Sequence, residues 1–392
     1  MMSRSLATSA THSRRSTIRR IFDAAQGRPD LIRLEIGEPS FVTPRHIIDG
    51  AMRAAAEGHT GYGPNGGLRS LRELLVDKLA TVDGITAEPR EIVVTPGGMN
   101  ALFTTYLALL EPGDQVLLPS PGFPNMDEMV RLLGGEPVFY PLRVEDGYIP
   151  DAGVIEELMT PRTTVLFVNS PSNPTGSVIP GDVVERLVAL ARAHDLWFIS
   201  DEVYDELILD DGVPHVAARR FDTDGRIITI HSFSKVYAMT GWRVGYAVAD
   251  ETVAVVMRKL QEPQVSCPST ISQKAAEAGL QGPRDPIDAM RDAYRERRDR
   301  AWAATQQAGL RGHRATATLY QTIDISDAGL PSLEFALRLL DEASVAVAPG
   351  SVFGPCGDGL VRISFAASPD AIEEGIARIG RAVREWAGAA AP

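Results

Sequence analysis

Short, continuous apolar runs alternate with amphipathic stretches through the middle of the chain. The runs that we expect to form β-strands span residues 92–94, 116–118, 164–168, 196–199, 226–230 and 244–248. Because their apolar residues are consecutive rather than alternating, both faces of the predicted sheet should be covered, as in a mainly parallel sheet. Helical patterns lie between the runs, at residues 68–80, 100–110 and 182–194. The pattern therefore predicts an α/β fold.

The pattern changes near residue 285. A long charged helix is predicted over residues 285–307, and shorter strands and a final helix from Pro369 follow it. We therefore expect a second, smaller domain in the C-terminal part. Its presence agrees with the prior of about two domains for a chain of this length.

Composition and charge narrow the possible partners. Hydrophobic residues make up 44% of the 392 residues, and the formal net charge is −12. An acidic chain is a poor match for a phosphate backbone, so no nucleic-acid partner is expected. No stretch approaches the roughly 18 consecutive apolar residues of a membrane helix, so no membrane partner is expected either.

The number and spacing of the cysteines and histidines bear on the cellular compartment and on metal binding. The 2 cysteines, Cys267 and Cys356, are far apart and form no CxxC pair, which favours a reducing compartment and a cytoplasmic protein. The 7 histidines are scattered without the spacing of a metal site, so no metal is predicted. The pair Arg14–Arg15 resembles a twin-arginine export signal, but polar and charged residues from Asp23 onward interrupt the apolar run that such a signal needs.

Polar residues follow three of the predicted strands at the point where each strand ends. They are Asn173 after the run at 164–168, Asp201 and Tyr204 after the run at 196–199, and Ser232, Ser234 and Lys235 after the run at 226–230. In a doubly wound sheet, ligands bind beyond the carboxyl ends of the strands. We therefore expect the functional site there.

The segment after residue 230 combines hydroxyls with two cations. Lys235 at the end of an apolar strand is a candidate Schiff-base nucleophile, because burial lowers the pKa of a lysine and an aldehyde traps the free amine. Alone it would be interpreted as a surface lysine. Ser232, Ser234 and Arg243 add hydroxyl and guanidinium donors that suit a phosphate. The ligand inferred from the set is a phosphorylated aldehyde, and pyridoxal 5′-phosphate fits it.

That cofactor requires further groups. Its ring nitrogen needs a carboxylate, for which Asp201 is the candidate, and its ring hydroxyl needs a neutral donor, for which Tyr204 and Asn173 are candidates. The glycine-rich turn at Gly97–Gly98, between a strand and a helix, would offer main-chain amides to the phosphate. Each residue also has an ordinary interpretation, as a helix cap, a turn or a core side chain. The prediction rests on their agreement.

Several motifs in this order and spacing resemble one family. The sequence resembles the pyridoxal-phosphate enzymes of fold type I, specifically the class I/II aminotransferases related to aspartate aminotransferase. The motifs are LEIGEPSF at 34–41, GYGP at 61–64, TPGG at 95–98, NSPSNPTG at 169–176, SDEVY at 200–204, SFSK at 232–235, GWRVG at 241–245 and RISFA at 362–366.

The resemblance implies a fold and a domain organisation. A large cofactor-binding domain is expected over 46–284, with a mainly parallel seven-stranded sheet between helices. A smaller α+β domain is expected from 1–45 together with 285–392. The implied activity is transfer of an amino group from an L-amino acid to a 2-oxo acid by a ping-pong mechanism.

The resemblance also implies roles for residues. Lys235 would form the Schiff base and move the proton between the substrate α-carbon and the cofactor, with Asp201 and Tyr204 also in the catalytic set. Arg362 would bind the substrate α-carboxylate, helped by Gly37 and Asn173.

Other implied roles concern the cofactor and the assembly. Phe123 would lie against the cofactor ring, and Gly97, Gly98 and Met99 would lie in the turn that holds it. Tyr62 would reach the phosphate of the neighbouring subunit, which implies a homodimer with shared active sites.

Substrate choice is less well defined by the sequence. Some aspartate-preferring relatives carry a lysine in the position of Met99, and methionine cannot form an ion pair. Phe123 lacks a polar tip and Met126 is close in sequence, so the donor is expected to be apolar or aromatic rather than aspartate. In the alternative, Arg19 or Arg20 supplies the cation.

Alternative functions remain open at this point. The segment GYGPNG at 61–66 matches the dinucleotide fingerprint GxGxxG, but a predicted helix at 47–57 precedes it where that fingerprint needs a strand. A lyase that eliminates or cyclises the substrate could use the same fold and cofactor. A third alternative is a binding or regulatory protein that retains the cofactor fold. Regulators of that kind usually carry an added DNA-binding domain, and we expect the N-terminal extension to be too short for one.

Overall fold

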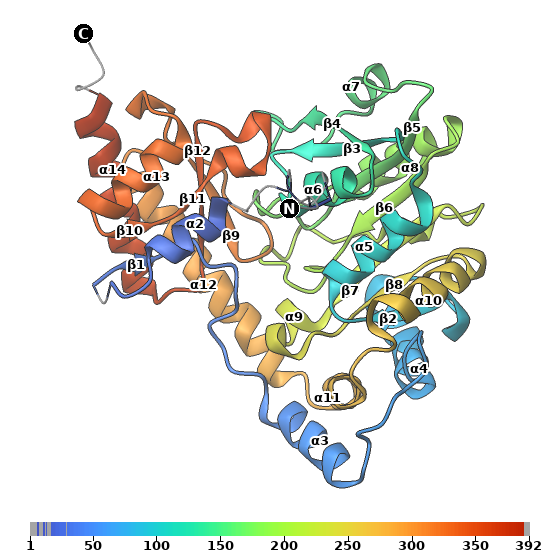
Figure 1. Cartoon of the computed structure of the whole chain (residues 1–392). Coiled ribbons are helices and arrows are strands. Elements are labelled where there is room, and N and C mark those ends of the chain that lie inside the picture. The colour runs from blue at the N-terminus through green and yellow to red at the C-terminus, as the bar shows by residue number, and fades with distance from the viewer. Residues whose placement is uncertain (1–5, 8–10, 12, 14–16, 29, 388–392) are drawn as a thin grey trace, which may run out of the picture.

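The computed structural model describes residues 6–7, 11, 13, 17–28 and 30–387, without the side chain of Arg19. Arg14–Arg15 of the possible export signal lie outside the described residues. Three sheets are present in this part of the chain: one of seven strands, one of three and one of two. Figure 1 shows the large sheet with its helices and, beside it, the C-terminal part of the chain.

The seven-stranded sheet contains the predicted apolar runs. Its strands are β2 (Ile92–Thr95), β3 (Gln115–Ser120), β4 (Glu136–Pro141), β5 (Thr163–Asn169), β6 (Trp197–Asp201), β7 (Ile227–Ser232) and β8 (Gly245–Val248). Their order is β2-β8-β7-β6-β5-β3-β4. Strands β3 to β7 run parallel, whereas β8 is antiparallel to both of its neighbours. The predicted mainly parallel α/β sheet is therefore confirmed.

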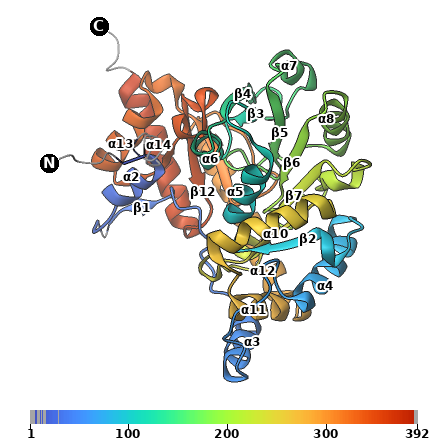
Figure 2. The ribbon, with the colours of Figure 1, turned by 45° about the vertical axis from the view of Figure 1, so that its right-hand side comes forward.

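Consecutive apolar residues in the central strands point alternately to the two faces of the sheet. In β5, Val165 and Phe167 belong to one buried cluster, whereas Leu166 and Val168 belong to another. Successive side chains of a strand point to opposite faces, so both faces need apolar residues when both are covered. Figure 2 shows α5 (Gly98–Leu109) and α10 (Glu251–Val265) on one side and α7 (Ala152–Glu157) and α8 (Gly181–Ala193) on the other.

The remaining helices and strands lie either near the large sheet or in the C-terminal part. They are α3 (Arg45–Ala56), α4 (Arg69–Lys78), α6 (Asn125–Leu132), α9 (Phe233–Val236) and α11 (Thr270–Gln281) near the large sheet, and α12 (Asp285–Gln307), β9 (Tyr320–Asp324), α13 (Ser332–Glu342), β10 (Val345–Ala346), β11 (Ala348–Pro349), β12 (Leu360–Ser364) and α14 (Pro369–Ala387) in the C-terminal part. Helix α3 comes before the glycine-rich segment at 61–66, as expected from the sequence.

The N-terminal segment packs with the C-terminal part. Strand β1 (Ile32–Arg33) pairs in parallel with β10, and helix α2 (Thr17–Ala24) contacts β11. Both views show α2 and β1 beside α13 and α14. The domain boundaries at 45/46 and 284/285 stay a prediction.

Two local features differ from the sequence prediction. Strand β4 was not among the predicted runs, because its sequence EPVFYP contains two prolines and lies at the edge of the sheet, where proline is tolerated. The helix predicted at 68–80 ends as an α-helix at Lys78 and continues as a π-helical segment, Leu79–Asp83. Asp83 lies within 3.0 Å of the Lys78 ammonium, so this segment brings a buried carboxylate to a buried cation.

Candidate active site

The carboxyl ends of three neighbouring parallel strands form the floor of one pocket. Asn169 at the end of β5 is in register with Asp201 at the end of β6, and Asp201 is in register with Ile230 of β7. The pocket has a volume of about 540 Å³. Its lining includes the sequence-predicted residues Gly37, Gly98, Met99, Phe123, Asn173, Asp201, Tyr204, Ser232, Ser234, Lys235, Arg243 and Arg362.

Lys235 lies in a short helix that begins directly after β7. The hydroxyl of Ser232 accepts a hydrogen bond of 3.1 Å from the main-chain N–H of Ser234 and so caps this helix. The half-buried Lys235 donates from Nζ to the carbonyl oxygen of Gly37 across 2.5 Å. The amine of Lys235 is therefore held in the pocket by a neutral acceptor.

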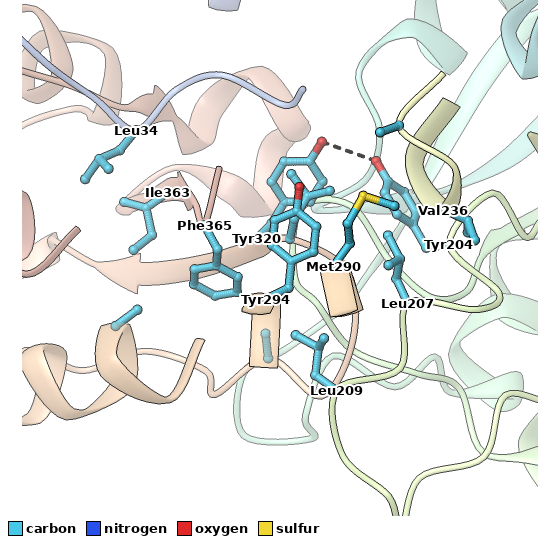
Figure 3. Close-up of a cluster of buried hydrophobic side chains, with 14 of the residues drawn as sticks. Leu34, Tyr204, Leu207, Leu209, Val236, Met290, Tyr294, Tyr320, Ile363 and Phe365 are labelled. Atoms are coloured by element: carbon cyan, nitrogen blue, oxygen red, sulfur yellow. Dashed lines mark hydrogen bonds between the residues drawn. The ribbon is translucent and has the colours of Figure 1, made fainter. Parts of the chain in front are cut away.

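Asp201 and Tyr204 are both buried beneath the pocket. Burial raises the pKa of Asp201 to about 7, although the N–H of Val203 donates to its carboxylate. Burial also raises the pKa of Tyr204 well above its usual range, and the Tyr204 hydroxyl donates to the hydroxyl of Tyr320 across 3.2 Å. Figure 3 shows this bond at the edge of a buried apolar cluster. Both hydroxyls are thus oriented by a neighbour.

Arg362 projects from β12 and is 3% exposed. Its Nη1 donates to Oδ1 of Asn173 across 3.0 Å, and its Nη2 donates to the carbonyl oxygen of Glu35 across 2.7 Å. The guanidinium carbon lies 4.3 Å from the centroid of the Tyr320 ring. Its Nε has no hydrogen-bond partner within the described part of the chain. The guanidinium is therefore fixed in place with donor capacity left for a carboxylate.

The turn between β2 and α5 lies against Arg243. Gly97 has a φ of +85°, and a Cβ there would come 2.5 Å from Nη2 of Arg243, so both the conformation and the close approach require glycine. Arg243 itself has a φ of +54°, and its Nη1 donates to the carbonyl of Thr240 across 2.8 Å. Helix α5 begins at Gly98, which lines the pocket, so the start of this helix lies at the pocket wall.

Two predicted residues do not line the pocket. Gly97 lies behind the pocket wall, against Arg243. Tyr62 is 94% exposed in the single chain. The role expected for Tyr62 belongs to a neighbouring subunit, and it stays a prediction.

Several pocket residues were not predicted from the sequence. Tyr320, Glu35, and Ile18 and Phe22 of α2 all line the pocket. Tyr320, on β9, carries no local signal, because it reaches the pocket through the packing of the C-terminal part. Glu35 belongs to the motif at 34–41, which could have indicated it. The amphipathic pattern TIRRIFDA over 17–24 could have indicated that α2 buries one face.

A buried group of acids and a histidine lies behind the strand ends. Oxygen or nitrogen atoms of Asp83, Asp205 and His231 lie within 4.8 Å of one another, an arrangement that sequence spacing did not predict. The ammonium of Lys78 bonds to both carboxylates, at 3.0 Å from Asp83 and also directly to Asp205. The group is therefore a buried ion-pair network in this structure, in which one ammonium is shared by two carboxylates.

Comparison with known proteins shows the family of the chain. The family model described as aminotransferase class I and II matches residues 29–379. The chain belongs to this family. This aminotransferase is 40% identical over 374 residues to an aspartate aminotransferase of Pyrococcus abyssi. The match covers 94% of this chain and 96% of that protein. It is 38% identical to aromatic-amino-acid aminotransferase 2 of Thermococcus litoralis, with the same coverage of 94% and 96%.

Solved structures give the same result for the fold. The structure of the aspartate aminotransferase of Thermus thermophilus with maleate superposes with a TM-score of 0.93 at 36% identity, covering 97% of this aminotransferase and 100% of that chain. These relatives are named as aminotransferases, so the lyase alternative is not favoured. Among the described residues, no helix is long and apolar enough to cross a membrane.

Proposed function

We propose that this aminotransferase uses pyridoxal 5′-phosphate to move an amino group from an L-amino acid to a 2-oxo acid by a ping-pong mechanism. The observation that carries the proposal is a single pocket lined by Lys235, the buried carboxyl of Asp201 and the buried guanidinium of Arg362. These groups suit an aldehyde, a ring nitrogen and a carboxylate, respectively. The pocket volume of about 540 Å³ lies in the range of small-molecule sites.

The donor set at one end of the pocket fits a phosphate. Ser232 and Ser234 offer hydroxyls, Arg243 offers a guanidinium, and Gly98 offers a main-chain amide at the start of α5. The close approach of Arg243 to Gly97 supports a common role for the turn and the guanidinium. We assign the cofactor phosphate to these residues.

The groups next to the phosphate end fit the cofactor ring. We assign Asp201 to the ring nitrogen, because a cationic nitrogen would favour the ionised form of a carboxyl whose pKa burial has raised to about 7. Tyr204 and Asn173 are assigned to the ring hydroxyl, and Phe123 and Met99 to the wall beside the ring.

The residues of this chain then divide the work of the reaction. The bound cofactor supplies an electron sink for negative charge at the substrate α-carbon. Lys235 would hold the cofactor covalently, and its free amine would move the proton at the substrate α-carbon. Arg362, held by Asn173 and the Glu35 carbonyl, binds the α-carboxylate and fixes the orientation of the bond to the α-hydrogen.

Apolar side chains support a donor that is not aspartate. Ile18, Phe22, Met99, Leu102 and Phe123 give the pocket an apolar lining. The alternative cation has less support, since Arg20 is exposed and does not line the pocket, and the side chain of Arg19 lies outside the described residues. We therefore propose an apolar or aromatic amino acid as the main donor.

We also propose a cytoplasmic homodimer in which Tyr62 completes the partner's site. The exposure of Tyr62, 94% in the single chain, supports this assignment, because a large side chain so exposed is available to a second subunit. Both cysteines are free thiols, which supports a reducing compartment.

The half-reaction tests the proposal. The cofactor-loaded protein is mixed with single amino acids and no acceptor, and the products are identified. We expect one 2-oxo acid for each molecule of pyridoxamine 5′-phosphate formed, fastest with apolar or aromatic donors. Ammonia released in proportion to turnover, with no pyridoxamine form of the cofactor, would overturn the proposal.

A further inference from the structure

The hydroxyl of Tyr320 lies between two groups of the proposed reaction. Tyr320 belongs to β9, is buried and lines the pocket. Its hydroxyl accepts a hydrogen bond of 3.2 Å from Tyr204, drawn in Figure 3, and donates one of 3.3 Å to the carbonyl oxygen of Gly37. The same carbonyl oxygen accepts from Nζ of Lys235 across 2.5 Å. Tyr320 therefore connects the loop after β6 with the segment after β1.

The ring of Tyr320 contacts the proposed carboxylate-binding group. The guanidinium carbon of Arg362 lies 4.3 Å from the centroid of the Tyr320 ring and 5.2 Å from the centroid of the Phe353 ring. Both distances are in the range of a cation–π contact, which is strongest where water is excluded. Because Arg362 is buried, the Tyr320 ring contributes to its position in addition to the bonds that Arg362 donates to Asn173 and to the Glu35 carbonyl.

The Tyr204 proton has two possible acceptors once the cofactor is bound. A hydroxyl carries one proton, so Tyr204 cannot donate to Tyr320 and to the cofactor ring oxygen at the same time. An anionic ring oxygen would compete with Tyr320 for this proton. A ring oxygen that carries its own proton can instead donate to Tyr204, and the bonds onward to Tyr320 and Gly37 then keep the direction seen here. The observed order of donors therefore favours the protonated ring oxygen.

The surroundings of Tyr204 keep its proton in place. Burial raises the pKa of Tyr204 well above its usual range, and the neighbouring Tyr320 hydroxyl adds to this increase. Two charged groups also act on Tyr204: the carboxylate of Asp201 raises its pKa further, whereas the guanidinium of Arg362 opposes the increase. Tyr204 is thus a neutral hydroxyl, and the direction of its single hydrogen bond decides what it offers to the cofactor.

We propose that Tyr320 is a positioning residue whose hydroxyl takes the Tyr204 proton away from the cofactor ring oxygen and whose ring holds Arg362 in place for the substrate carboxylate. One buried side chain then acts on both the cofactor and the substrate. The two roles use different parts of this side chain, so substitutions can separate them. This inference rests on the proposed transamination and adds a residue to its mechanism.

The absorbance of the cofactor-loaded protein tests the role of the hydroxyl. The visible absorbance of pyridoxal 5′-phosphate bound to a lysine changes with the proton shared by its ring oxygen and the lysine nitrogen, so a pH titration gives a midpoint. Tyr320→Phe frees the Tyr204 proton for the ring oxygen and should lower this midpoint by about 0.5–1 pH unit, the effect of one hydrogen bond. An unshifted or higher midpoint in Tyr320→Phe would overturn the inference.

A double-mutant cycle shows whether the effect passes through Tyr204. Tyr204→Phe removes the donor to the ring oxygen and should raise the midpoint. In the Tyr204→Phe background, adding Tyr320→Phe should change nothing further, because the proton that Tyr320 takes is already absent. Additive shifts in the double variant would contradict the inference.

Binding of the amino acid tests the role of the ring. The amino-acid concentration at half-maximal rate is measured in the half-reaction. Tyr320→Phe keeps the ring, so this concentration should change by less than about twofold, whereas Tyr320→Leu removes the ring and should raise it by about tenfold. Equal values for Tyr320→Phe and Tyr320→Leu would overturn the inference.

Tyr148 provides the matched control. Its buried hydroxyl accepts a hydrogen bond from Thr322, which also belongs to β9, and Tyr148 is not among the pocket-lining residues that the structure describes. Tyr148→Phe and Tyr148→Leu should therefore leave both measurements unchanged. A shift in Tyr148→Phe equal to that in Tyr320→Phe would contradict the assignment to Tyr320.

An isosteric replacement keeps the test independent of the folding of Tyr320→Phe. In 3-fluorotyrosine at position 320 the hydroxyl is a weaker acceptor of nearly the same shape, so the midpoint should fall by a smaller amount than in Tyr320→Phe; an unchanged or higher midpoint would overturn the inference. If the wild-type protein formed no absorbing adduct with the cofactor, the proposed function would fail. A normal wild-type titration with unshifted Tyr320 variants would overturn this inference alone.

Discussion

Nη1 of Arg362 donates to Oδ1 of Asn173 across 3.0 Å, although 189 positions separate the two residues in the chain. The bond joins β12 of the C-terminal part to the loop that follows β5 of the large sheet. A second bond, from Nη2 to the carbonyl of Glu35, adds the N-terminal segment. The proposed carboxylate-binding group is therefore held by three segments that come together only in the folded chain.

Arg362→Lys should weaken substrate binding more than it affects the fold. Lysine keeps the charge but lacks the planar guanidinium, whose several N–H groups can bond to Asn173, to the Glu35 carbonyl and to a carboxylate at the same time. Loss of one or two charge-assisted bonds corresponds to about 2–4 kcal/mol, or roughly 30- to 1000-fold in kcat/KM, mainly through a higher KM. Steady-state kinetics with the cofactor-loaded variant measure this, with the surface variant Arg300→Lys as control. An unchanged KM would show that another group binds the carboxylate.

Gly37→Ala should impair activity through a steric conflict. A Cβ at this position would lie 2.5 Å from the Tyr320 hydroxyl, which itself bonds to Tyr204. Either Tyr320 or the segment after β1, which carries the Gly37 carbonyl that accepts from Lys235, must then move, and we expect a loss of kcat/KM of at least about tenfold. Gly212→Ala is the control, because nothing lies within 4 Å of a Cβ there. Equal kinetics for the two variants would contradict this expectation.

Asp201→Asn should change how the stability of the cofactor-free protein depends on pH. Burial raises the pKa of Asp201 to about 7 in the folded state, whereas the unfolded chain ionises near its ordinary value of about 4. Between those values the folded state binds more protons, so this carboxyl lowers stability as pH rises, by at most about 1.4 kcal/mol per pH unit. Asparagine removes the effect. As the pH rises from about 4 to about 7, urea unfolding should therefore show the variant gaining stability relative to the wild type. The same pH dependence of stability in both proteins would contradict the raised pKa of Asp201.

Lys78→Met should destabilise the protein strongly. The Lys78 side chain is 9% exposed, and its ammonium forms ion pairs with the buried carboxylates of Asp83 and Asp205. Removing one partner of a buried ion pair costs about 3–5 kcal/mol, because the remaining charges lose their compensation. Urea unfolding measures the loss, and Lys78→Met with Asp205→Asn should recover part of it. The exposed Lys259→Met should change stability by less than about 0.5 kcal/mol; a similarly small effect at Lys78 would show that the network contributes little.

The sequence was most informative where chemistry follows a strand. Asp201 and Lys235 were predicted from their positions directly after apolar runs, and the parallel register of β6 and β7 brings those ends together. The apolar runs themselves were sufficient to predict the mainly parallel sheet, because both of its faces are buried.

Residues that reach the pocket from a distance could not be predicted in this way. Tyr320 reaches the pocket from β9, outside the listed motifs, and Glu35 belongs to the motif at 34–41, which by itself assigned a role to Gly37 alone. Strand β4 was missed because its prolines oppose a strand assignment, whereas its edge position tolerates them. Local patterns carry no information on such long-range contacts.

Mapping the covalent attachment site of the cofactor tests the central claim most directly. The cofactor-loaded protein is treated with borohydride, digested and analysed by mass spectrometry. The account predicts a reduced cofactor adduct on Lys235 and on no other lysine, and its loss in Lys235→Ala together with amino-group transfer. An adduct on a different lysine, or an unchanged adduct in Lys235→Ala, would contradict the assignment of this pocket as the active site.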